Sequence, residues 1–244
     1  MLRSGARAAA FLADAERRVA ALEVGAPVAI RVNPRARRVA LRIDAAARQV
    51  ELVLPRGIAL AHGLNFLDAQ RGWIAARLAT LPMAVPFAAG AAVPVLGVSH
   101  VIRREVSPTA PPVVIADGEI RVKGDPAHLP RRVKDHLARL AARELARRTG
   151  DFAARIDRRV TRVTVRDTKS RRGSCSASGA LSFSWRLVMA PEPVIDYVVA
   201  HEVAHLVEMN HGPRFWRLVR TLVPDTVVPR AWLKRHRDRL FSYG

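Results

Sequence analysis

Two histidines and a glutamate stand close together near the carboxyl end of the chain, where His201, Glu202 and His205 form the pattern H-E-x-x-H. In a helix, positions i and i+4 lie on the same face, so His201 and His205 can present two imidazole nitrogens to one ion. Glu202 lies roughly 100° around the helix from His201, where it can hold a water beside the metal rather than the metal itself. This pattern is typical of zinc metalloproteases.

A third histidine, His211, follows His205 by six residues. If the helix continued, His211 would lie about 9 Å further along the axis, too far away to share the ion. Asn210 and the Gly-Pro pair at 212–213 are helix-stop signals, because Asn tolerates the left-handed conformation found at many helix ends. We therefore expect the chain to turn there and to bring His211 back toward His201 and His205. The predicted site is one zinc ion held by these three histidines, with Glu202 as the catalytic residue.

The spacing of the three histidines equals that of the metzincin motif, but Glu208 stands where that motif has glycine, and no Met-turn is evident. The chain is therefore not assigned to the metzincins. The segment that carries the pattern is predicted as one helix over residues 193–209. Apolar residues occupy much of its circumference, so it is expected to be buried. Histidines inside a buried helix are costly unless their ring nitrogens find partners, and a zinc ion would supply one.

The 244 residues include 41 Lys and Arg against 21 Asp and Glu, a formal net charge of +20. Such a charge attracts polyanions, so weak contact with nucleic acid or nucleotides is an alternative partner prediction beside a peptide or protein substrate. The arginines are spread along the chain rather than grouped in a tail. This distribution favours a general compositional preference for arginine over a specific polyanion-binding function. With one cysteine, Cys175, no intramolecular disulfide can form.

No run of residues approaches the ~18 apolar residues that a membrane span needs, so no membrane association is expected. Residues 1–24 mix arginine with acidic residues, a pattern that interrupts any signal-peptide core and predicts a short amphipathic helix. A cytoplasmic location is the simplest interpretation. The oligomeric state is left open.

Alternating apolar residues over 28–32, 38–43 and 49–54 predict three consecutive strands, connected by turn-like segments into an antiparallel meander. Residues 58–80 follow helical spacing, with a break expected near Gly63 or Gly72. More strands are predicted over 93–96, 98–105, 113–116 and 119–122, the last two joined by an Asp-Gly hairpin turn. The Gly-Asp-Pro segment at 124–126 is the expected subdomain boundary.

The remaining part of the chain alternates helices and strands. A helix with a basic face is predicted over 129–149 and ends at Gly150 as a C-cap. Strands are predicted over 160–165 and 179–185. The strand over residues 181–185 is expected to line the cleft and to pair with an extended peptide.

Four segments in order resemble the YgjP-like metallopeptidase family, a bacterial group related to the SprT-like and WLM zinc proteases. They are residues 169–176, 181–187, 196–206 and 210–216. The resemblance implies a zincin-type catalytic unit with His201, His205 and His211 as zinc ligands and Glu202 as the catalytic residue. One departure is Arg172, which stands where the family has tryptophan and puts the packing of that loop in question.

The expected fold is therefore α+β, with an N-terminal antiparallel β-rich part packed against a zincin-like catalytic part that has a central H-E-x-x-H helix. Its expected divisions are an N-terminal extension over 1–27 and a metallopeptidase domain over 28–240. Within that domain, residues 28–125 form the β-rich subdomain and 126–240 the catalytic subdomain.

Two alternative functions remain beside zinc-dependent peptide hydrolysis. A metal-dependent nucleotide or phosphoester hydrolase would use arginines such as Arg171 and Arg172 against phosphates. A protease acting on nucleic-acid-bound proteins would bind DNA in a salt-dependent way. Cys175 and Tyr197 are interpreted as packing residues, although Tyr197 lies one helical turn before His201.

Overall fold

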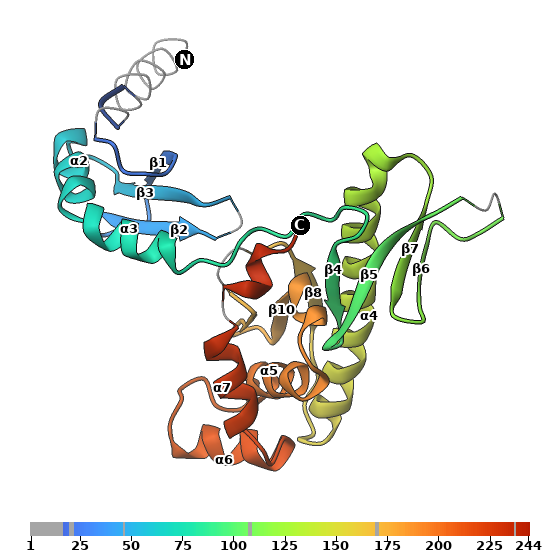
Figure 1. Ribbon diagram of the computed structural model, residues 1–244. Coiled ribbons are helices and arrows are strands. Elements are labelled where there is room, and N and C mark those ends of the chain that lie inside the picture. The colour runs from blue at the N-terminus through green and yellow to red at the C-terminus, as the bar shows by residue number, and fades with distance from the viewer. Residues whose placement is uncertain (1–16, 20–21, 46, 107–108, 169–170, 237) are drawn as a thin grey trace, which may run out of the picture. The chain divides into compact units, whose positions relative to one another are not determined.

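The computed structural model describes residues 17–19, 22–45, 47–106, 109–168, 171–236 and 238–244. The chain divides into two compact units, Met1–Ala84 and Val85–Gly244 (Figure 1). The amphipathic helix predicted over residues 1–24 falls largely outside the described residues, of which 17–19 are helical. Among the helices of the described residues, none is long and apolar enough to cross a membrane.

The first unit contains a three-stranded sheet of mixed direction, formed by β1 (Val28–Asn33), β2 (Ala40–Asp44) and β3 (Gln49–Pro55). The strand order is β1-β3-β2, with β1 parallel and β2 antiparallel to β3. The predicted antiparallel meander is therefore wrong for β1. The reason lies in β3, whose residues from Leu52 to Pro55 are all buried. Such a continuous apolar run suits the centre of a sheet, so β3 takes the position between the other two strands.

Two helices follow, α2 (Leu60–Ala69) and α3 (Arg71–Ala79). The break predicted within residues 58–80 occurs at Gln70 (φ −101°, ψ 7°) and not at a glycine. Gly63 instead lies within α2, where an added Cβ would stand 2.4 Å from a methyl carbon of Leu54. This glycine therefore serves the close approach of α2 to β3.

The second unit opens with a four-stranded sheet in the order β4-β5-β7-β6. Its strands are β4 (Ala92–Val95), β5 (Val98–Glu105), β6 (Val113–Ala116) and β7 (Glu119–Lys123). The hairpin predicted at Asp-Gly is confirmed, because β6 and β7 pair in antiparallel fashion and both turn residues have positive φ, 53° and 72°.

This four-stranded sheet shares its core with the helix that follows it. Ile102 and Ile120 belong to the same buried cluster as Val133 and Leu137. The compact units accordingly divide after Ala84, whereas the expected subdomain boundary lay at 125/126. The Gly-Asp-Pro segment is a turn within the second unit, leading into a short 3-10 helix, η1 (Pro126–His128).

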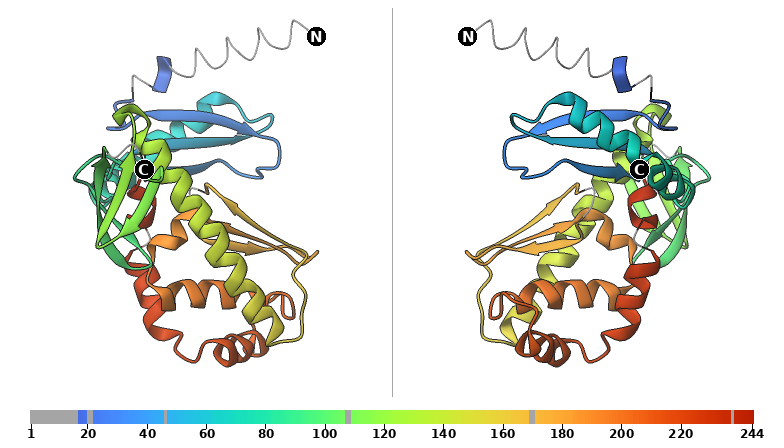
Figure 2. Two further views of the ribbon diagram at one scale, coloured as in Figure 1. Left: turned by 90° about the vertical axis from the view of Figure 1, so that its right-hand side faces the viewer. Right: turned by 90° about the vertical axis from the view of Figure 1, so that its left-hand side faces the viewer.

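The long helix α4 (Leu129–Ala154) runs through the second unit and contacts α5 and strands of both sheets, as the views in Figure 2 show. Apolar side chains at a spacing of four residues form its buried stripe. The predicted end at Gly150 is too early, because Phe152 and Ala153 continue that stripe for another turn. Packing of an apolar face contributes more to helix length than the low helix propensity of one glycine.

The second sheet of this unit consists of β8 (Arg162–Arg166), β9 (Gly173–Cys175) and β10 (Ala180–Ser184). In the strand order β8-β10-β9, the central strand pairs parallel with β8 and antiparallel with β9. Because both edges of β10 are occupied, it cannot pair with a peptide as the sequence suggested. The edge strands are β8 and β9, and β9 is a short segment of small residues that sequence patterns did not indicate as a strand.

The rest of the unit is helical. After η2 (Trp185–Met189), the chain forms α5 (Glu192–Ala204), α6 (Pro213–Leu222), α7 (Val227–Arg235) and η3 (Arg239–Ser242). Nine residues of α5 are buried, including Val199, Ala200 and Val203, which have no exposed surface. The expectation of a buried H-E-x-x-H helix therefore agrees with the packing of α5.

Candidate metal centre

The carboxyl end of α5 carries the first two histidines. His201 and Glu202 lie in the last turn of the helix, and His205 is its C-cap. The predicted helix over 193–209 is thus too long. After Ala204 the backbone hydrogen bonds change to the shorter 3-10 pattern, in which the amides of Leu206 and Val207 donate to carbonyls only three residues earlier. Asn210 does not have positive φ, so the predicted left-handed stop is not what ends the helix.

The turn after α5 brings the third histidine beside the first two. Nitrogen atoms of His201, His205 and His211 all lie within 4.8 Å of one another. The Nε2 atoms of His201 and His211 are 3.0 Å apart. Among the described residues, these three histidines are the one group whose side chains could together hold a metal ion. Their convergence agrees with the prediction that the chain turns back after His205.

Hydrogen bonding and burial favour the neutral form of two of these imidazoles, those of His201 and His205. The Nδ1 atom of His205 lies 3.0 Å from the carbonyl oxygen of Glu208, a contact that places the proton on Nδ1 and leaves Nε2 free. Burial, followed by the neighbouring His205, His211 and Arg230, lowers the pKa of His201 to about 4. Burial also lowers the pKa of His205. Neutral imidazole is the form that binds metals.

Glu202 is buried beside the triad, with 8% of its surface exposed. Burial raises the pKa of its carboxyl group to about 7. The backbone of Gly173 on β9 passes directly over this carboxylate, since an added Cβ would lie 2.6 Å from Oε1 of Glu202. Glycine at position 173 therefore leaves the space that the carboxylate occupies, and β9 becomes one wall of the site.

An aromatic side chain that the sequence analysis did not single out lies against the triad. The ring of Phe215 on α6 lies 4.9, 4.6 and 4.6 Å, centroid to centroid, from the rings of His201, His205 and His211. It is completely buried. The sequence signal for this contact was the position of Phe215 just after the Gly-Pro pair at 212–213. The chain must turn there to bring His211 back toward the other two histidines, so the residues that follow also lie near the site.

Three further side chains lie near the triad. The indole of Trp216 lies 5.9 Å from the ring of His211, and the guanidinium of Arg230 on α7 stacks over that indole at 4.9 Å. Tyr197, predicted as a packing residue, is 6% exposed, and its ring lies 6.1 Å from the ring of His201. Burial raises the pKa of Tyr197.

The loop before β9 is anchored by Arg172. Its Nη2 atom donates to the carbonyl of Leu233 on α7 at 2.9 Å, and its own carbonyl accepts from Ser184. Arg172 thus ties β9 to α7 and is half-buried, whereas Arg171 is exposed. Cys175 is half-buried on β9, where burial and then the charge of Glu202 raise the pKa of its thiol.

The other end of α5 is fixed by a buried arginine from α4. Arg148 is 5% exposed and forms ion pairs with Asp196 and, at 2.7 Å, with Glu192. Burial opposes its charge, but the hydrogen bonds that Arg148 donates to Glu192 and Asp196 outweigh that effect and raise the pKa of Arg148. This network holds the first turns of α5 against α4.

Comparison with known proteins identifies the family. A family model described as YgjP-like, metallopeptidase domain, matches residues 37–236. The chain belongs to the YgjP-like metallopeptidase family. The match includes all three histidines and Glu202. Neither the curated proteins nor the solved structures gave a match. Membership makes this chain a metal-dependent hydrolase of the peptidase class, with a protein or peptide as the implied substrate.

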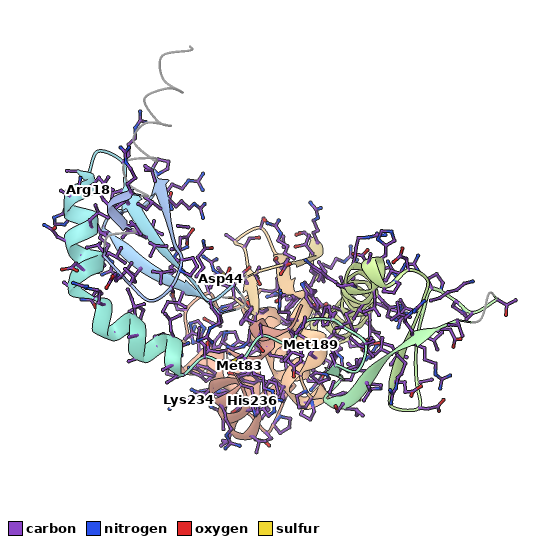
Figure 3. All side chains as sticks on the ribbon, turned by 45° about the horizontal axis from the view of Figure 1, so that its top comes forward. Arg18, Asp44, Met83, Met189, Lys234 and His236 are labelled. Carbon is purple, nitrogen blue, oxygen red and sulfur yellow. The ribbon has the colours of Figure 1, made fainter. Side chains whose placement is uncertain are left out.

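A separate cavity of about 220 Å³ lies in the second unit between the four-stranded sheet and the carboxyl-terminal helices. Its lining includes Met189 and His236, both labelled in Figure 3, and Trp232, whose ring stacks on His236 at 4.4 Å. None of the three histidines of the candidate centre lines this cavity.

Proposed function

We propose that this chain is a zinc-dependent metallopeptidase of zincin type, in which His201, His205 and His211 bind one zinc ion and Glu202 is the general base. The convergence of three imidazoles beside a buried carboxylate is the observation that carries the proposal. A catalytic zinc usually has three protein ligands and keeps one position for water or substrate, which suits a site with three histidines.

The donor set fits zinc. Nitrogens bound tetrahedrally at about 2.0–2.1 Å lie roughly 3.3–3.4 Å from one another, close to the 3.0 Å between Nε2 of His201 and His211. The buried Nδ1 atom of His201 has no hydrogen-bond partner among the described residues, so its ring depends on Nε2 for a polar contact. When bound, zinc lowers the pKa of water and polarises the scissile carbonyl.

Glu202 moves the proton. A carboxyl group with a pKa of about 7 is poised to accept and release a proton near neutral pH. Its carboxylate takes a proton from the water that attacks the scissile carbonyl carbon, and then delivers that proton to the nitrogen of the leaving amine. The backbone of Gly173 limits the space around the carboxylate.

The free edge of β9 offers a docking line for an extended peptide. In the antiparallel pairing with β10, the carbonyl of Arg172 and the amide of Ser176 bind β10. Gly173 and Cys175 therefore direct their backbone N–H and C=O groups away from β10. A peptide strand added there would pass beside Glu202, and strand addition supplies main-chain hydrogen bonds without requiring a particular sequence.

The deciding experiment compares wild-type protein with Glu202→Gln and His205→Ala. We expect wild type to bind one equivalent of zinc and to hydrolyse peptides, Glu202→Gln to bind zinc without activity, and His205→Ala to lose both. Full activity in zinc-loaded Glu202→Gln would rule out the general-base role. A parallel screen of nucleotides and phosphoesters tests the alternative, which would be favoured by hydrolysis of those compounds and not of peptides.

A further inference from the structure

The outer face of the β8-β10-β9 sheet is hollowed into a groove of about 500 Å³. We name it the arginine groove. Its lining includes three arginines and several hydroxyl side chains: Arg162, Arg166, Arg171, Thr164, Ser174 and Ser182. These side chains share one face of the sheet because side chains alternate along each strand and the strands are in register. Thr164 pairs with Ser182, and Ser182 pairs with Ser174. The opposite face contributes Leu181 and Phe183 to the core.

The arginine groove is strongly positive. Arg162 and Arg166 lie on one face of β8, four residues apart, and Arg171 lies two residues before the start of β9. All three are exposed, and none forms an ion pair within the described part of the chain. No carboxylate is among the residues that line the groove. The sheet therefore presents cations and hydroxyl donors with nothing on the groove to neutralise them.

The arginine groove adjoins a second hollow that reaches one residue of the candidate metal centre. This hollow, of about 340 Å³, shares Ser176 with the groove and has His205 in its lining. Two more exposed arginines, Arg158 and Arg159, line this second hollow, again without a carboxylate. Exposed arginines therefore line both the groove and the hollow that contains His205.

We propose that the arginine groove binds acidic side chains of the peptide substrate and makes the enzyme selective for acidic segments next to the scissile bond. The proposal rests on the peptidase function proposed above. A peptide strand on the free edge of β9 projects alternate side chains onto the outer face of the sheet, beside Arg171 and Ser174. Arg162 and Arg166 stand two strand spacings from β9, about 9.6 Å, and line the same groove as Arg171 and Ser174.

An acidic polypeptide fits this surface better than a nucleic acid strand. Proteins that bind single strands combine positive charge with aromatic side chains on which bases stack. The one aromatic residue of the groove lining, Phe183, has no exposed surface and points into the core. Arginine and hydroxyl donors instead match carboxylates, which arginine can bind through two parallel hydrogen bonds.

Binding can be tested separately from cleavage. The zinc-loaded Glu202→Gln variant is titrated against a fluorescent peptide with glutamate at alternate positions, its glutamine counterpart, and a single-stranded oligonucleotide. The groove variant carries Arg162→Gln and Arg166→Gln. The matched control carries Arg139→Gln and Arg143→Gln, which remove the same charge from exposed positions of α4.

We expect the acidic peptide to bind at least about tenfold more tightly than its glutamine counterpart at low salt, and the preference to weaken as salt rises. The groove variant should lose that preference and the control variant should keep it. Equal binding of the two peptides, or an unchanged preference in the groove variant, overturns the proposal. Tighter, groove-dependent binding of the oligonucleotide overturns it in favour of nucleic acid.

Cleavage by the wild-type enzyme provides the second measurement. The ratio of kcat/KM for the acidic peptide to that for its glutamine counterpart should fall in the groove variant, mainly through KM. Groove-dependent binding of the acidic peptide without any cleavage would support the groove and contradict the peptidase proposal. Cleavage of both peptides at equal rates would contradict the groove and leave the peptidase proposal standing.

Discussion

Glu202 combines deep burial with a negative charge, and the combination affects the stability of the folded chain. Burial raises the pKa of Glu202 from 4.5 to about 7. Between these values the folded chain holds more protons than the unfolded chain, so this group's contribution to stability is complete below pH 4.5 and is lost as pH rises toward 7. A residue kept for proton transfer therefore destabilises the protein at neutral and alkaline pH.

We predict that Glu202→Gln stabilises the metal-free protein in a pH-dependent way. At about pH 8 the free energy of unfolding should rise by about 3 kcal/mol, because glutamine cannot acquire the buried charge. Below pH 4.5 the variant and wild type should have similar stability. Denaturant titrations with a chelator at several pH values measure this, and an equal difference at every pH would contradict the burial effect.

Gly173 provides a second prediction for a single residue. In Gly173→Ala the new Cβ would displace the carboxylate of Glu202, with which it overlaps at 2.6 Å. We expect kcat to fall by about 100-fold, since a shift of about 1 Å in a catalytic group can cost that much, while zinc binding is retained. Zinc stoichiometry and peptide turnover, measured on the same sample, separate the two effects.

Much of the candidate centre follows from residue types and spacing. The H-E-x-x-H pattern and a third histidine after stop signals predicted that His201, His205 and His211 would converge, and the structure brings them together. Gly173 and Phe215 were not foreseen. Their contacts join segments distant in sequence, and such contacts depend on tertiary packing that no local pattern encodes.

At the scale of elements, α4 packs against α5 and against strands of both sheets of its unit. Gly150 lies inside α4 with an exposed position and no atom within 4 Å of an added Cβ. We predict that Gly150→Ala stabilises the protein by roughly 0.5–1 kcal/mol, because alanine loses less backbone entropy in a helix. Thermal or denaturant unfolding measures the gain, and unchanged peptidase activity makes this variant the matched control for Gly173→Ala.

The ion pairs of Arg148 between α4 and α5 lead to a prediction of lower stability. Arg148→Ala removes a buried cation and leaves Asp196 and Glu192 without their partner. We expect the free energy of unfolding to fall by about 2 kcal/mol, below the range for fully buried pairs because both carboxylates are partly exposed. Wild-type stability in this variant would show that the network contributes nothing to the packing of α5.

Local signals predicted most strands and the Asp-Gly hairpin, but not the pairing of segments distant in sequence. The turn before β3 indicated its antiparallel pairing with β2, whereas nothing local indicated that β1 would lie parallel to β3. The position of β10 between two strands could not be predicted either, because apolar and polar residues alternate in the same way in a central strand and in an edge strand. Helix ends were misjudged at Gly150 and after Ala204 because packing and tightened bonds, not propensity, decide them.

At the scale of the whole molecule, every residue of the candidate centre lies in the unit from Val85 to Gly244. That unit has its own continuous core, and the unit before it has a separate one around Leu52, Leu54 and Leu67. We predict that residues 85–244 expressed alone fold cooperatively and bind one zinc ion. Calorimetry and metal analysis test this, and a chain that remains unfolded would show that the second unit depends on the first.

The free edge of β9 also affects the solubility of the protein. An unpaired strand edge is a template for another copy of the same chain, and most proteins cover such edges or interrupt them. This one must stay open if it receives substrate, so its protection comes from its length of three residues and from mutual repulsion at a net charge of +20. Concentrated salt shortens the reach of that repulsion to about 3 Å. Purified protein should therefore remain dispersed in dilute buffers and self-associate in concentrated salt.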